Sequence, residues 1–151
     1  TAFTVAHSIT LGASVLGYIP IQRGAIEAAI ALSIVLLARE IVVGGRGVVP
    51  LTHRKPWLVA FVFGLLHGLG FAGALGDIGL PESAIPSALL FFNLGVEAGQ
   101  LAFVLVLLLV HRLLLATKRL QLPKLDPFLG YALGALATMW FFDRLPSIWG
   151  A

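Results

Sequence analysis

The sequence contains no cysteine, a single methionine and few charged residues, which make up 11% of its 151 positions. Without cysteine the chain can form neither a disulfide framework nor a thiolate site. One thioether, that of Met139, does not suffice to select a soft ion such as Cu(I). Any metal bound by this chain must therefore be held by imidazole, carboxylate, amide or hydroxyl groups. The sequence also lacks a glycine-rich phosphate loop and the HExxH and GxSxG patterns, which excludes the commonest nucleotide-binding and hydrolase signatures.

Hydrophobic residues make up 59% of the chain, and the charged fraction is less than half of the ~25% that is usual in soluble domains. The composition therefore predicts an all-α membrane protein, with residues 1–151 forming one transmembrane helix bundle of about five spans. The net charge of +3 gives no reason to expect a nucleic-acid partner, because in a membrane protein the placement of basic residues matters more than their sum. The predicted spans are residues 2–19, 24–43, 57–76, 87–111 and 127–142.

The span at residues 57–76 carries a histidine at its middle and no charged residue. His67 lies ten residues past Trp57, which places its imidazole ~15 Å deep, near the midplane of a bilayer. A polar group at that depth is costly unless it has a partner. Small residues recur at every fourth position around it and predict a close contact with another helix. These residues are Gly64, Gly68, Ala72 and Gly76.

Two further spans carry polar stripes. On the first, one helix face holds Thr4, His7, Thr10 and Ser14, and on the fourth, Asn93, Glu97 and Gln100 are spaced i, i+4 and i+7. His7, His67 and Glu97 fall at a similar depth, and imidazole with carboxylate is a ligand set that suits borderline divalent ions. We therefore predict a midplane metal site of these three residues. The amides and hydroxyls beside them are of the types that orient metal ligands, and the predicted supporting residues are Asn93, Gln100, Thr10 and Ser14.

The same residues also allow a structural interpretation. Asn93 and Gln100 can form interhelical hydrogen bonds, which contribute ~0.6 kcal/mol each on average. Glu97 and His67 can likewise pair with each other without any metal. The sequence alone leaves these alternatives open.

Basic residues cluster in two of the loops. The loops at 44–56 and 112–126 together contain seven of them, including Lys118, Arg119 and Lys124, whereas the opposite side has Arg23 and Arg144 alone. The positive-inside rule then predicts that Thr1 is cytoplasmic and that Ala151 lies outside. A cytoplasmic start favours a further span upstream of Thr1.

Three segments resemble those of the HupE/UreJ-type hydrogenase and urease accessory membrane proteins: TAFTVAHSITL at 1–11, FGLLHGLGFAGAL at 63–75 and FNLGVEAGQL at 92–101. The resemblance covers nearly the whole chain and keeps the order of the motifs. It implies a bacterial inner-membrane protein associated with nickel supply, acting as a nickel permease, with His7, His67 and Glu97 at the positions of the family's polar motifs. Family members usually carry a span with a histidine- and aspartate-containing motif before the first segment, which agrees with the expected upstream span.

The expected function is therefore transport or delivery of a divalent ion, Ni²⁺ first and Zn²⁺ second, without catalytic residues. One alternative is an intramembrane hydrolase in which a metal held by His and Glu activates water, a reaction that needs three protein ligands and an open position. Another is a structural membrane subunit whose polar stripe holds helices or a partner together. The expected partners are the lipid bilayer, the metal ion, and a second copy of the chain or other membrane subunits.

Overall fold

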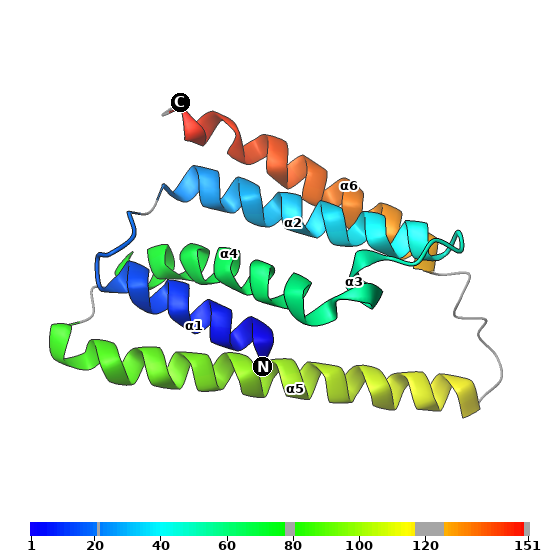
Figure 1. Cartoon of the computed structure of the whole chain (residues 1–151), viewed down its shortest axis with the longest axis horizontal. Helices are drawn as coiled ribbons and strands as arrows, with labels where there is room; N and C mark the ends of the chain where they lie inside the picture. The colour runs from blue at the N-terminus through cyan, green and yellow to red at the C-terminus, as the bar shows by residue number, and fades with distance from the viewer. Residues whose placement is uncertain (21, 78–80, 117–125, 150–151) are drawn as a thin grey trace.

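The structure, a computed structural model, describes residues 1–20, 22–77, 81–116 and 126–149, and within these ranges it is all-helical (Figure 1). This confirms the predicted all-α class. The two single turns Glu82–Ala84 (η1) and Pro146–Ile148 (η3) are 3₁₀ helices. The α-helices are α1 (Ala2–Val15), α2 (Arg23–Gly44), α3 (Leu51–Arg54), α4 (Pro56–Asp77), α5 (Ile85–Ala116) and α6 (Asp126–Arg144).

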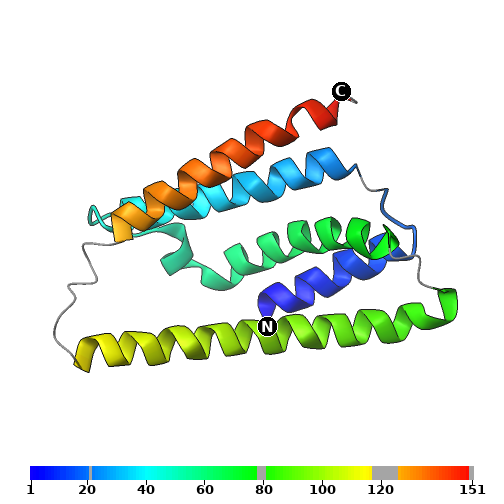
Figure 2. The same cartoon turned by 180° about the vertical axis from the view of Figure 1, so that it is seen from behind.

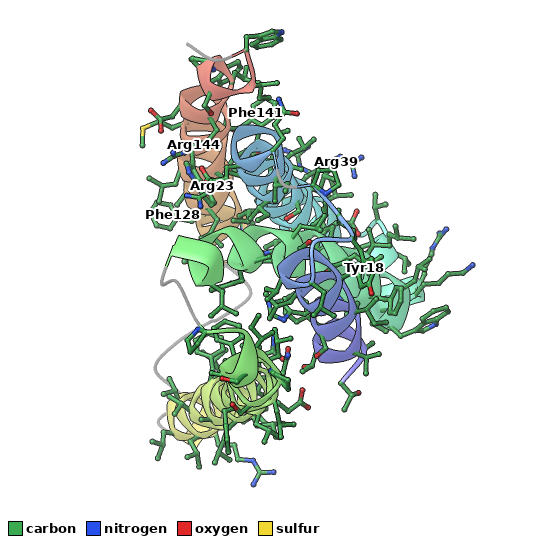
Figure 3. The ribbon with its side chains drawn as sticks, turned by 90° about the vertical axis from the view of Figure 1, so that its left-hand side faces the viewer. Tyr18, Arg23, Arg39, Phe128, Phe141 and Arg144 are labelled. Carbon is green, nitrogen blue, oxygen red and sulfur yellow. The ribbon has the colours of Figure 1, made fainter. Side chains whose placement is uncertain are left out.

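The helices form a layered bundle in which α1 and α4 occupy the middle. α1 packs against α4 and α5, α4 also contacts α2, and α2 packs against α6. The views from the front and from behind both show α5 along one edge and α6 along the other (Figures 1 and 2). Viewed from the side, α5 stands apart from the α2 and α6 pair, with α1 and α4 between them (Figure 3). Side chains of α1 therefore reach both α4 and α5.

α1 ends at Val15 and is therefore shorter than the predicted span at 2–19. The helix stops because Gly17 reverses the direction of the chain. Gly17 has a φ of +80°, in the left-handed region that glycine adopts without a steric penalty. Around it, the Tyr18 amide donates to the Ala13 carbonyl at 2.9 Å and the Gly17 amide donates to the Ser14 carbonyl at 3.0 Å. These two bonds are those of a Schellman motif, which satisfies the last carbonyls of a helix.

The other predicted spans lie within a few residues of helices, with two differences. α5 extends to Ala116, beyond the predicted end at residue 111. The segment 44–56, predicted to be a loop, contains the single-turn helix α3, which follows Pro50. The Thr52 amide in α3 donates to Glu40 Oε2 on α2 at 3.1 Å, so a carboxylate caps this turn.

Two helical segments, Pro56–Gly73 and Ile85–Leu113, are long and apolar enough to cross a membrane by length and composition. α1 is apolar but has only 14 residues, or ~21 Å of helix. The five-span bundle and its orientation therefore remain predictions. Lys118, Arg119 and Lys124, which contribute to the predicted orientation, lie outside the described residues.

Candidate functional site

The centre of the bundle is the contact between α1 and α4, and small residues make it close. A Cβ added to Gly64 would lie 2.9 Å from the Ala6 Cβ, and one added to Gly68 would overlap the Thr10 hydroxyl and the His7 carbonyl. The Thr10 hydroxyl donates to the Leu65 carbonyl at 2.8 Å and so ties the two helices together. The predicted helix contact along the glycine stripe is confirmed. Its consequence is that His7 lies directly against the backbone of α4.

We call His7, His67 and Asn93 the histidine layer. The His7 side chain is almost fully buried, with 1% of the residue exposed, and its Nδ1 lies 3.1 Å from Asn93 Oδ1 on α5. His67 Nδ1 lies 2.8 Å from the Phe63 carbonyl one turn earlier on α4. The ring of Phe3 contacts both imidazoles, so the two histidines share an aromatic neighbour. Three helices thus contribute to one polar group of residues.

The partners of the two imidazoles determine which nitrogen carries the proton. A carbonyl oxygen only accepts, so His67 Nδ1 must donate to Phe63. Asn93 Nδ2 donates to the Leu89 carbonyl at 2.8 Å, which orients its amide so that Oδ1 faces His7 and accepts from Nδ1. In the neutral imidazoles, Nε2 is then the nitrogen with the lone pair, as in histidines that bind metals and are oriented through Nδ1. His7 Nε2 is buried and has no hydrogen-bond partner among the described residues.

Three phenylalanines surround the histidine layer. The Phe3 ring centroid lies 5.9 Å from that of His7 and 5.4 Å from that of His67. Phe71 and Phe92 lie 5.6 Å and 5.9 Å from His7. Sequence reasoning missed these residues, although their spacing carries a signal: Phe3 precedes His7 by four positions, and Phe71 follows His67 by four. Together they cover the His7 imidazole, which is almost fully buried, and in such a low-dielectric environment electrostatic interactions are stronger than in water.

We call Thr4, Glu97 and Gln100 the carboxylate layer. The Thr4 hydroxyl donates to Glu97 Oε2, and it also lies 3.4 Å from Gln100 Oε1. The backbone nitrogen of Thr1 lies 3.6 Å from Glu97 Oε1. Because α1 and α5 run antiparallel, Thr4 faces Glu97 one turn away from the pair formed by His7 and Asn93. That separation is ~5 Å along the helix axis.

The structure therefore distributes the predicted site residues over two layers. His7 contacts Asn93 and shares the Phe3 ring with His67, whereas Glu97 and Gln100 meet Thr4. Thr10 donates to backbone carbonyls rather than to a histidine, and Ser14 is buried farther along α1. Within the described residues, no three His, Asp or Glu side chains are grouped closely enough to hold a metal ion.

An all-helical fold with two helices long and apolar enough to cross a bilayer fits the class of α-helical membrane proteins. The family model described as HupE / UreJ protein matches residues 1–144. The chain belongs to this family of membrane proteins, which are accessory to hydrogenase and urease and are linked to nickel and cobalt. Comparison with curated proteins and with solved structures finds no significant match.

Proposed function

We propose that the protein moves a divalent metal ion, nickel above all, across the bacterial inner membrane, and that the ion passes between the histidine layer and the carboxylate layer. The metal is the cargo in this proposal. The proposal includes the predicted orientation, in which α2, α4, α5 and α6 cross the bilayer, α1 runs from the cytoplasmic side towards the outer side, and Ala151 lies outside. Membership of a family linked to nickel supports the choice of ion.

The observation that carries the proposal is the buried lone pair of His7 Nε2. If the imidazole served only to hold α1 against α5, its bond to Asn93 would suffice, and a second buried nitrogen without a partner would be a net cost. A metal ion bound to Nε2 would accept its lone pair and so remove that cost. His67, oriented in the same way through Nδ1, supplies a second nitrogen from the facing helix.

The separation into two layers suits transport better than storage. A closed site with four protein ligands holds its metal as part of the fold, whereas conduction requires binding that is favourable enough for entry and weak enough for exit. Two imidazoles provide borderline nitrogen ligands, and the carboxylate of Glu97 provides negative charge one turn away. An ion that moves between the layers exchanges one partial ligand set for another.

Uptake of radioactive nickel by cells or proteoliposomes tests this function. His7→Ala and His67→Ala should each lower uptake by more than about 100-fold, since loss of an orienting partner alone costs 10–100-fold. Matched controls are His53→Ala and His111→Ala, which remove exposed imidazoles outside the two layers. If both layer variants reach the membrane at normal levels and take up nickel as the unmodified protein does, the proposal is wrong.

A further inference from the structure

A groove of about 460 Å³ lies between α2 and α6, away from the histidine and carboxylate layers. Two of its lining residues, Arg39 and Arg46, are basic, and none is acidic. Its floor is made of small and aliphatic side chains of both helices, among them Val35, Val42 and Ala135. The groove thus combines an apolar floor with a basic rim.

The two arginines are exposed and lie at different heights along α2. Arg46 follows the end of α2, and its Nη2 donates to the Tyr131 hydroxyl on α6 at 2.9 Å. Arg39 lies five residues before the end of α2, so it is ~7.5 Å from that end along the helix axis. Its side chain is 66% exposed, and it lies on the outer side of the bundle (Figure 3).

Within the part of the chain that the structure describes, Arg39 has one ionic contact, with Glu40 Oε1 at 3.5 Å. That contact is weak, because neighbouring residues on a helix do not face each other. The other carboxylate oxygen of Glu40 accepts from the Thr52 amide. A guanidinium exposed on the outer side of a membrane helix needs a further anionic or polar partner.

We propose that this groove binds one anionic phospholipid, whose phosphodiester is held by Arg39 and Arg46 and whose acyl chain lies on the apolar floor. Guanidinium groups match phosphate oxygens in geometry, and basic pockets between membrane helices are known to bind anionic headgroups. The Tyr131 hydroxyl adds a hydrogen-bond donor at the interface. The inference rests on the part of the proposed function that places α2 and α6 in the bilayer.

Native mass spectrometry of the full chain in detergent, with phosphatidylglycerol and phosphatidylcholine of identical acyl chains added separately, tests the site. Phosphatidylglycerol should be retained at one molecule per chain and should raise the unfolding temperature more than phosphatidylcholine does. R39Q/R46Q should weaken its retention by about tenfold or more. Ala135→Phe, which fills the exposed groove and keeps both charges, should also weaken it.

The matched control is R54Q/K55Q, which removes two exposed positive charges beside the same loop but outside the groove. It should retain phosphatidylglycerol normally, and millimolar inorganic phosphate should not displace the lipid. Equal loss in both double variants, or equal retention of the two lipids, would overturn the proposal in favour of diffuse attraction. Displacement by inorganic phosphate would overturn it in favour of a free-anion site, and cross-linking of residue 135 between two chains would assign the groove to a second copy.

Nickel uptake separates this inference from the proposed function. His7→Ala and His67→Ala should abolish uptake and still retain the lipid. If the two histidine variants still take up nickel normally while R39Q/R46Q loses the lipid as predicted, the transport proposal is wrong and the lipid site is supported.

Discussion

The bundle contains two closely packed helix pairs, α1 with α4 and α2 with α6, and they differ in what their contacts enclose. Both use small residues: a Cβ on Gly130 would lie 2.7 Å from Val42 Cγ2, much as one on Gly68 would meet α1. Between α2 and α6, Arg144 Nη1 lies 3.1 Å from Glu27 Oε2 and forms an ion pair with it. Between α1 and α4 lies an imidazole with a bare nitrogen. Arg144 Nε also lacks a hydrogen-bond partner within the described ranges, but it is a donor and lies 3.6 Å from Asp143 Oδ2, whereas His7 Nε2 offers a buried lone pair. Close packing therefore positions a site, and a buried lone pair distinguishes that site from the other helix contact.

The largest expected effect follows from overpacking the α1 and α4 pair. Gly68→Leu should destabilise the protein by about 3 kcal/mol or more, because backbone of α1 occupies the space that the new side chain needs. Gly130→Leu should do the same at the second pair. Unfolding temperature in detergent and the level of protein in the membrane measure the effect. The control is Gly99→Leu, since nothing lies within 4 Å of its added Cβ; equal stability of the Gly68 and Gly99 variants would contradict the packing described here.

The next largest effect tests whether the orientation of the His7 imidazole matters for nickel binding, and not only its presence. Asn93→Leu removes the acceptor for His7 Nδ1 and should weaken nickel binding by about 10–100-fold. Asn93→Asp keeps an acceptor oxygen and should restore most of the affinity. Calorimetric titration of purified protein with nickel measures both variants. If leucine and aspartate at this position gave the same affinity, Asn93 would not act through the imidazole.

Glu97→Gln tests whether the two layers act separately. The Gln side chain can still accept from the Thr4 hydroxyl, so the helix contact survives while the charge is lost. We expect the rate of nickel uptake to fall several-fold while equilibrium binding at the histidine layer stays nearly unchanged. A loss of binding as large as that of His67→Ala would instead place Glu97 in the same ligand set as the histidines.

The smallest effect is expected at the charged pair between α2 and α6. Glu27→Gln should lower stability by less than about 1 kcal/mol, because both partners are more than one-third exposed and solvent screens the interaction. Nickel binding should stay unchanged, as measured by the same titration. A marked loss of metal binding in this variant would remove the distinction between the two helix pairs.

The sequence predicted much of this arrangement because its signals are local. Helix positions follow from apolar runs, and a close contact of α4 with another helix follows from Gly64 and Gly68, whose spacing lies on one helix face. The structure identifies that helix as α1. The end of α1 was predicted wrongly, because hydropathy continues to Tyr18 while Gly17 reverses the chain through a Schellman motif. An apolar run indicates that a segment is buried in lipid or protein, but it does not indicate the residue at which the helix ends.

Several polar residues of the two layers could be singled out from the sequence, but their partition into layers and the surrounding phenylalanines could not. Depth alone placed His7, His67 and Glu97 at a similar level. Which side chains meet depends on the antiparallel register of α1 and α5, which sets Asn93 opposite His7 and Glu97 opposite Thr4. A shift by one turn would exchange those partners without changing any sequence pattern.

The most direct test of the account is X-ray absorption at the nickel edge on purified protein loaded with one equivalent of nickel. The account predicts scattering from two imidazole rings coordinated through nitrogen, with one ring lost in His7→Ala and the other in His67→Ala, and with no change in His53→Ala. Nickel that shows no imidazole scattering, or whose imidazole scattering is the same in both layer variants as in the unmodified protein, would contradict it.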